Sequence, residues 1–182
     1  MPDNTVEKNA TINKKVCLLG DFGVGKTSLV RRFVYERFED KYLSTIGVKV
    51  SRKTMVLSYQ DKLIDLSIIL WDLAGSEEFN QFRASYLRGA SGIMLVCDLT
   101  RPETLHHLPS YLDDMHQVCP MADVILAANK ADLKEEQRLS PSEIEAFVSG
   151  LKIPYYLTSA KSGEGVETIF HQLGHLMMAR QL

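Results

Sequence analysis

Cysteine, long apolar runs and net charge are all scarce in this 182-residue sequence. Cys17, Cys97 and Cys119 are odd in number and widely spaced, and the first two lie in apolar runs typical of core strands. This argues against a disulfide framework and favours a reducing compartment. No apolar stretch approaches the ~20 residues of a membrane helix, and the polar start, 1–15, lacks a signal-peptide core. We therefore expect a cytoplasmic protein.

The formal net charge of −2 gives the chain no overall attraction for polyanions, so we expect no nucleic-acid partner. The chain has the length of about one domain, and its 45% hydrophobic content is enough for a sizeable core. The polar start has almost no apolar anchor. We expect a flexible arm over 1–13 and a single domain over 14–182.

Apolar runs alternate with helical periodicities from residue 14 onward. The expected strands are 16–19, 48–59, 63–71, 93–97, 124–128 and 153–157, and the expected helices follow residue 25 and cover 102–118, 141–150 and 166–179. The short polar connection 60–62 predicts an antiparallel hairpin. The pattern predicts an α/β three-layer sandwich with a six-stranded, mostly parallel sheet and one antiparallel edge hairpin. Ligands bind such sheets at the carboxyl ends of the strands.

A phosphate-binding motif follows the first expected strand. Residues 20–27, GDFGVGKT, match G-x-x-x-x-G-K-[ST] and open a helix, as in P-loop NTPases. Backbone amides and the positive end of the helix dipole would surround a phosphate there. We expect Lys26 to reach the β and γ phosphates of a nucleotide and the Thr27 hydroxyl to bind Mg²⁺. The alternative is an ordinary glycine-rich turn.

Two further loops indicate which base the bound nucleotide carries. Asn129, Lys130 and Asp132 form N-K-x-D after the expected strand 124–128, at the same sheet edge as the phosphate motif. A carboxylate such as Asp132 can accept hydrogen bonds from both the N1–H and the N2 amino group of guanine, a donor pair that adenine lacks. This predicts GTP rather than ATP. The tetrapeptide 158–161, TSAK, can add a backbone donor to the guanine O6.

With these residues in place, the sequence resembles the Ras superfamily of small GTPases, most closely its Rab branch, over residues 14–179. The motifs occur in the family's order: GDFGVGKTS, Thr45 within YLSTIGV, WDLAGSEEF, NKAD and TSAK. The resemblance implies a GTP/GDP switch in which Thr45 adds a second hydroxyl to Mg²⁺, Asp72 holds the metal through water, and Gly75 donates its N–H to the γ phosphate. It also implies that Phe38 packs against guanine, whereas the residues alone allow a core residue at a helix end.

Motifs and resemblance together give the expected site. Catalytic residues are Lys26, Thr45, Gly75 and Ser76; nucleotide contacts are Gly23, Val24, Gly25, Lys26, Thr27, Ser28, Phe38, Thr45, Gly75, Asn129, Lys130, Asp132, Ser159, Ala160 and Lys161; Mg²⁺ ligands are Thr27, Thr45 and Asp72. The resemblance further implies effector and regulatory proteins that bind through residues about 37–50 and 72–88. In Rabs an exposed aromatic cluster serves effectors; here it corresponds to Trp71, Tyr86 and Val50, which replaces a phenylalanine. Trp71 can equally be a strand residue covered by its own chain.

Two positions depart from the family pattern. Ser76 stands where a glutamine usually orients the attacking water, and its side chain is too short to hold both that water and a phosphate oxygen. Phe22 replaces a small residue beside the γ phosphate. We expect slow hydrolysis unless Gln81 or Glu77 substitutes. One alternative is a nucleotide-loaded interaction module with negligible turnover. A phosphate-transferring kinase is disfavoured because the motifs leave no evident acceptor site.

The carboxyl end also differs from the family pattern. Rabs normally finish with cysteines that carry prenyl groups, but here the final cysteine is Cys119 and the sequence ends MMARQL. We therefore expect no direct lipid anchor in this chain. Either a tail has been removed, or the protein works without its own anchor and reaches membranes only through partners.

Overall fold

The computed structural model describes residues 11–39, 44–75 and 80–180, apart from the side chains of residues 80 and 81. Within these ranges, six strands form one sheet in the order β2-β3-β1-β4-β5-β6. They are β1 (Thr11–Leu19), β2 (Val48–Tyr59), β3 (Lys62–Leu73), β4 (Gly92–Asp98), β5 (Asp123–Asn129) and β6 (Tyr155–Thr158). Only the β2–β3 pair is antiparallel, and it lies at one edge. The predicted fold class is confirmed.

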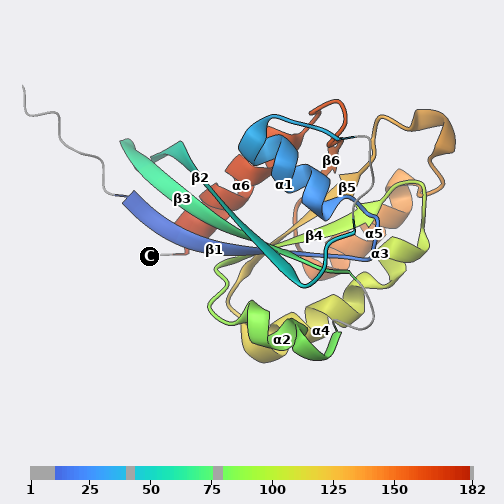
Figure 1. Ribbon diagram of the computed structural model, residues 1–182, viewed down its shortest axis with the longest axis horizontal. Coiled ribbons are helices and arrows are strands. Elements are labelled where there is room, and N and C mark those ends of the chain that lie inside the picture. Colours follow the sequence, from blue (N-terminus) through green and yellow to red (C-terminus); the bar gives the residue numbers. More distant parts are fainter. Residues whose placement is uncertain (1–10, 40–43, 76–79, 181–182) are drawn as a thin grey trace, which may run out of the picture.

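Helices cover both faces of this sheet (Figure 1). They are α1 (Lys26–Tyr35), α2 (Asn80–Leu87), α3 (Glu103–His106), α4 (Leu108–Val118), α5 (Pro141–Leu151) and α6 (Val166–Ala179), with a short 3₁₀ turn, η2 (Lys134–Glu136). Helices α1 and α6 pack on one face, and α4 and α5 contribute to the core on the other. Strand order reverses at β1, between β3 and β4, which is where such sheets bind ligands.

Strand β1 shows how one short segment supports both core layers. Successive side chains of a strand point to opposite faces. Val16 and Leu18 accordingly join the cluster under α1 and α6, while Cys17 and Leu19 join the cluster under α4 and α5. All four are buried. The second half of the central strand is therefore buried on both faces, and its carboxyl end is held in place from both sides.

The structure differs clearly from the expected elements in three places. Strand β1 begins at Thr11 because residues 11–13 pair with β3, so the last part of the expected arm is strand; its remainder, 1–10, lies outside the described residues. The helix expected over 102–118 is divided at His107 into α3 and α4. Pro109 lies in the first turn of α4, where its missing N–H costs no hydrogen bond. Helix α2 was not anticipated.

The start of α5 matches its prediction. The Ser140 hydroxyl accepts a hydrogen bond from the Glu143 N–H, and the Glu143 carboxylate accepts one from the Ser140 N–H, which makes a capping box.

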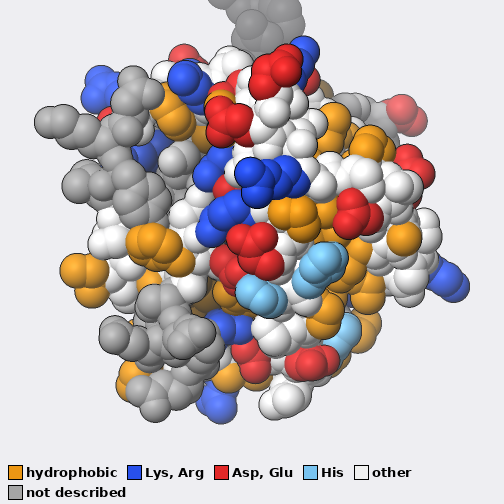
Figure 2. Space-filling model, turned by 90° about the vertical axis from the view of Figure 1, so that its right-hand side faces the viewer, with side chains coloured by type: hydrophobic (Ala, Val, Ile, Leu, Met, Phe, Trp, Pro, Cys, Tyr) orange, Lys and Arg blue, Asp and Glu red, His pale blue; other side chains and the backbone are white. Residues whose placement is uncertain are grey.

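Two features of the fold concern binding partners and membranes: the distribution of charge on the surface and the length of the apolar helices. On the face shown in Figure 2, basic and acidic side chains are intermixed, as the small net charge leads one to expect. Among the described helices, none is long and apolar enough to cross a bilayer.

Candidate functional site

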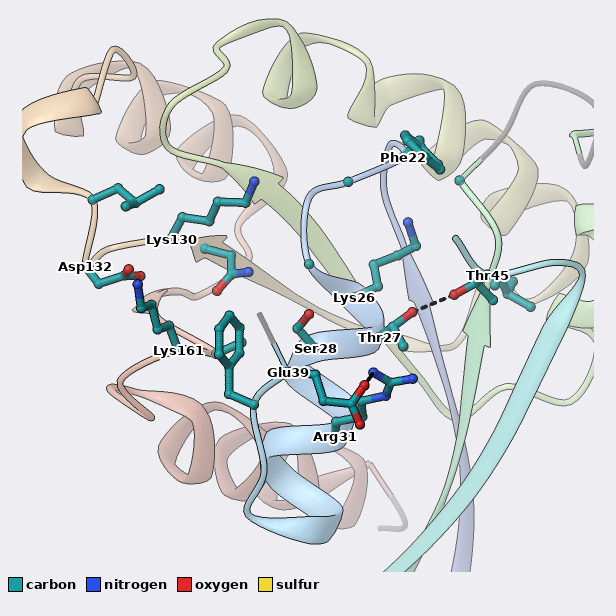
Figure 3. A pocket seen from close by; sticks show the side chains of 18 residues that line it. Phe22, Lys26, Thr27, Ser28, Arg31, Glu39, Thr45, Lys130, Asp132 and Lys161 are labelled. Atoms are coloured by element: carbon teal, nitrogen blue, oxygen red, sulfur yellow. Dashed lines mark hydrogen bonds and ion pairs between the residues drawn. The ribbon is translucent and has the colours of Figure 1, made fainter. Parts of the chain in front are cut away.

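A cavity of about 310 Å³ opens at the carboxyl ends of the strands, within the size range of ligand pockets. Figure 3 shows its lining side chains. They are Phe22, Gly23, Gly25, Lys26, Thr27, Ser28, Arg31, Phe38, Glu39, Thr45, Leu73, Gly75, Asn129, Lys130, Asp132, Leu133, Ala160 and Lys161. The fold thus brings residues of all five sequence motifs to one concave site.

The loop between β1 and α1 needs glycine for both conformation and space. Gly23 and Gly25 have φ of 76° and 104°, in the left-handed region that side chains rarely adopt. A Cβ on Gly25 would collide with the Asn129 side-chain nitrogen. Helix α1 begins at Lys26, directly after Gly25, so its unpaired first amides face the cavity. The loop can therefore approach an anion with backbone N–H groups.

Lys26 lies beneath this loop and is 6% exposed. Its Nζ donates hydrogen bonds to the carbonyl oxygens of Gly20 and Asp21, at 2.6 and 2.9 Å. Burial lowers the pKa of Lys26 to about 8, and the opposing attraction of the Asp72 carboxylate is weaker. The Lys26 ammonium group is therefore held in the cavity wall, where burial disfavours its charge. An anionic ligand would favour the charged form again.

Three oxygen-bearing side chains meet beside Lys26. The Thr27 hydroxyl donates to Asp72 Oδ2 at 2.5 Å and lies 2.7 Å from the Thr45 hydroxyl (Figure 3). They come from α1, β3 and the segment before β2. Asp72 is 1% exposed, and its Oδ1 is buried without a hydrogen-bond partner among the described residues.

This oxygen cluster fits a hard divalent cation. Burial raises the pKa of Asp72, and the Thr27 hydrogen bond and the nearby Lys26 only partly offset that rise. A cation would favour the charged carboxylate, and a water bound to that cation would supply the missing partner for Oδ1. Mg²⁺ prefers oxygen ligands and keeps several waters beside nucleotide phosphates. The residues present therefore suit Mg²⁺.

The loops after β5 and β6 are joined by side-chain hydrogen bonds at the other end of the cavity. Asn129 Nδ2 donates to the Val24 carbonyl at 2.9 Å, and Thr158 Oγ1 donates to Asn129 Oδ1 at 3.1 Å. The Ser159 hydroxyl donates to Asp132 Oδ1 at 2.6 Å. Asp132 is thereby oriented along the cavity wall (Figure 3).

Asp98 anchors two cations next to the phosphate loop. Its Oδ2 lies 2.6 Å from Lys130 Nζ and accepts from Arg101 Nε at 3.0 Å, while the Arg101 guanidinium also donates to the Phe22 carbonyl at 2.9 Å. Burial alone would raise the pKa of Asp98, but hydrogen bonds from Lys130, Thr100 and Arg101 outweigh it and lower that pKa. Lys130 itself has a φ of 68°, so its position is strained for a non-glycine residue.

Most of the expected site residues line this cavity, and a few do not. Val24, Asp72 and Ser159 are fully or almost fully buried in its walls. Ser76 lies outside the described residues, as does its possible substitute Glu77. Phe38 packs against the α1/α6 core and also lines the cavity, and its packing against guanine stays a prediction.

Sequence reasoning missed four lining residues. Leu73 and Leu133 directly follow Asp72 and Asp132, so adjacency to a motif was a usable signal for them. Arg31 and Glu39 carry no such signal, because their approach depends on how the chain turns back after α1.

Trp71 is half-buried rather than freely exposed. Its ring lies 6.2 Å from that of Tyr86, and Lys15 Nζ is 3.9 Å above it. Val50 is 52% exposed. Val50 pairs directly with Trp71 in the β2–β3 ladder, so the two side chains lie on the same face of the sheet, and Tyr86 of α2 approaches Trp71 there.

The side chain of Asp21 ties the phosphate loop to α4. Its Oδ1 accepts a hydrogen bond from the Tyr111 hydroxyl at 2.9 Å, and its Oδ2 lies 2.6 Å from His107 Nδ1. Arg83 of α2 lies 4.0 Å from the centre of the Tyr111 ring and pairs with Asp114 at 2.9 Å. One carboxylate thus connects the loop to α4 and to the junction between α3 and α4.

We expect Tyr111→Phe to lower the free energy of unfolding by about 1–3 kcal/mol, because the ring contacts remain but a buried hydrogen bond to a carboxylate is lost. Urea unfolding followed by circular dichroism measures this change. Tyr35→Phe is the matched control, since Tyr35 is 53% exposed. Equal stability of the two variants would show that the Asp21 contact contributes nothing.

Comparison with known proteins places this site in context. The family model described as Ras family matches residues 15–179. The chain is 36% identical over 173 residues to "GTP-binding protein ypt5" of Schizosaccharomyces pombe, covering 93% of this chain and 81% of that protein. It is 36% identical to "Ras-related protein Rab-1D" of Dictyostelium discoideum, covering 92% and 78%. With "Ras-related protein Rab-27B" of Homo sapiens it is 30% identical, covering 91% and 80%.

Proposed function

This chain belongs to the Ras family and is Rab-like, and on that premise we propose that it is a GTP/GDP switch that binds its nucleotide with Mg²⁺ and hydrolyses GTP slowly. The nucleotide occupies the cavity with its phosphates at the loop before α1 and its guanine at the loops after β5 and β6. The site residues named from the sequence keep those roles in this proposal.

One observation carries the proposal: Thr27, Thr45 and Asp72 converge beside Lys26. A phosphate and a divalent cation together satisfy every group there, since the cation takes the oxygens and the phosphate takes the lysine. Thr45 comes from a segment that is distant in sequence. A ligand that binds Thr45 through its metal therefore controls the position of that segment, which is how a switch of this kind signals.

Hydrolysis in this site is attack by water on the γ phosphorus, in line with the bond to the β phosphate, which breaks to leave GDP and inorganic phosphate. Bound Mg²⁺ supplies neutralisation of the developing charge on the phosphate oxygens. Lys26 and the first amides of α1 hold the β and γ phosphates. Gly75 lies so close to the same loop that a Cβ there would be 2.5 Å from the Phe22 nitrogen, which supports the proposed contact of its N–H with the γ phosphate.

We expect single-turnover hydrolysis no faster than about 10⁻⁴ s⁻¹, because Ser76 cannot position the attacking water. Phe22, which is 49% exposed at the cavity mouth, further crowds the γ phosphate. Ser76→Gln should raise the rate about ten- to hundredfold, and Phe22→Gly should add to it. Release of phosphate from preloaded protein measures all three rates. A fast parent protein, or no gain in Ser76→Gln, contradicts slow hydrolysis while leaving nucleotide binding intact.

Effector and regulatory proteins form the second part of the proposal. They bind the segments about 37–50 and 72–88, of which residues 40–43 and 76–79 lie outside the described ranges. The described parts support this role because Ile46 and Val50 are 93% and 52% exposed next to Thr45, the residue that the metal would hold. Attachment to membranes is peripheral in this proposal. Chromatography of the co-purifying nucleotide tests the central claim, and a guanine nucleotide is the expected result.

A further inference from the structure

After α1 the chain turns back toward the cavity at which the helix begins. Helix α1 starts at the cavity with Lys26 and ends at Tyr35, followed by Glu36 in a left-handed conformation with φ of 55°. That conformation turns the chain back. Phe38 and Glu39 then line the cavity again.

The number of residues after α1 limits how far back along the helix Glu39 can lie. Three residues from Glu36 to Glu39 span at most about 10 Å, whereas the helix rises about 7.5 Å from Arg31 to Glu36. The backbone of Glu39 can therefore come level with Arg31 but cannot reach the first turn of the helix. In agreement, Arg31 Nη1 donates to Glu39 Oε2 at 2.7 Å (Figure 3).

The pair belongs to the cavity wall and not to the outer surface alone. Both residues line the cavity, and the Arg31 side chain is only 22% exposed, against 52% for Glu39. Phe38, the residue directly before Glu39, lines the same cavity, and under the proposed function it packs against the base. Whatever holds Glu39 therefore limits how far Phe38 can move away from a bound base.

Besides the packing of Phe38, two polar side-chain contacts join the described parts of the returning segment to α1: Glu39 with Arg31, and Thr45 with Thr27. They differ in chemistry. Under the proposed function, the Thr45 contact depends on a γ phosphate and its metal, but the Arg31–Glu39 pair needs neither. It therefore persists in both nucleotide states.

We propose that the Arg31–Glu39 ion pair is a latch that keeps Phe38 over the base and thereby slows release of the nucleotide, whether GDP or GTP. The inference rests on the proposed function, and it assigns Arg31 and Glu39 as positioning residues. Because the pair is partly exposed, its removal should accelerate release about two- to fivefold. The acceleration should be the same for GDP and for a non-hydrolysable GTP analogue.

The test is a double-mutant cycle on nucleotide release. The parent, Arg31→Gln, Glu39→Gln and the double variant are loaded with a fluorescent GDP and chased with unlabelled GDP at low salt. Glu167→Gln is the matched control, because the Lys53–Glu167 pair has a similar length of 2.8 Å and similar exposures of 24% and 57% but does not line the cavity.

The latch predicts that each single variant releases GDP two- to fivefold faster, that the double variant is no faster than the singles, and that Glu167→Gln matches the parent. High salt should bring the parent toward the Glu39→Gln rate, since it screens the pair. Parent-like release from Glu39→Gln overturns the latch, and so does a double variant whose acceleration is the product of the two singles. A parent that retains no guanine nucleotide overturns the proposed function itself.

Discussion

Asp132→Ala is expected to abolish the preference for GTP over ATP. In the proposed complex the Asp132 carboxylate accepts two hydrogen bonds from guanine, and each bond to a charged acceptor contributes about 1.5–3 kcal/mol. Their loss should weaken GTP binding by about 10²- to 10⁴-fold. ATP binding should change little, because adenine offers no matching pair of donors. Competition of GTP and ATP against a fluorescent GDP measures both affinities.

Two control variants distinguish the effect of the Asp132 carboxylate itself from the effects of its hydrogen-bond partner and of surface charge. Ser159→Ala removes the 2.6 Å hydrogen bond to Asp132 while keeping the carboxylate, so it should cost far less than Asp132→Ala. Asp113→Ala removes an exposed carboxylate of α4 and should leave selectivity unchanged. If Asp132→Ala still prefers GTP by the parent's margin, then the base is recognised elsewhere.

Nucleotide affinity is expected to fall about tenfold per pH unit above about pH 8, which is the second large effect. Burial lowers the pKa of Lys26 to about 8 in the free protein, whereas bound phosphates favour its charged form and raise that pKa. Below pH 8 the free protein already carries the charge, so affinity does not depend on this group. Above pH 8 binding must take up a proton, and the affinity decreases until the pH reaches the pKa of the complex.

Titration of GDP binding from about pH 7 to about pH 9 measures this slope. Lys26→Arg is the control, because a guanidinium stays charged over that range and its complex should show only the titration of the nucleotide itself. Lys26→Ala should lose most of the affinity at every pH. A parent slope equal to that of Lys26→Arg would show that Lys26 is already charged in the free protein throughout.

The contiguous motifs could be predicted from the sequence because their chemistry is local. GDFGVGKT places Lys26 and Thr27 at the start of a helix, and the left-handed φ at Gly23 and Gly25 leaves few residue types that fit. That N-K-x-D would lie at the same rim followed from the rule that parallel strands end on the same edge. The cavity brings these motifs together as that rule requires.

Contacts between elements could not be predicted in the same way. The pairing of Asp21 with His107 and Tyr111 depends on how α3 and α4 divide at residue 107, which the helical periodicity of 102–118 did not indicate. The pairing of Arg31 with Glu39 depends on the left-handed turn at Glu36. Charge and spacing offered many alternative partners for each of these side chains.

By itself the sequence determined the fold class, the phosphate motif and the two departures from the family pattern at Phe22 and Ser76, and it predicted that the Asp132 carboxylate recognises the base. These follow from hydrophobic periodicity and from residue types at short spacing, because both act through the conformation of the local backbone. Only the tertiary structure decided that Lys26 is buried, that Asp72 keeps an unpartnered oxygen beside Thr27, and that Arg31 faces Glu39. Desolvation and ion pairing depend on distances through space, and those exist only once the sheet and its helices have packed.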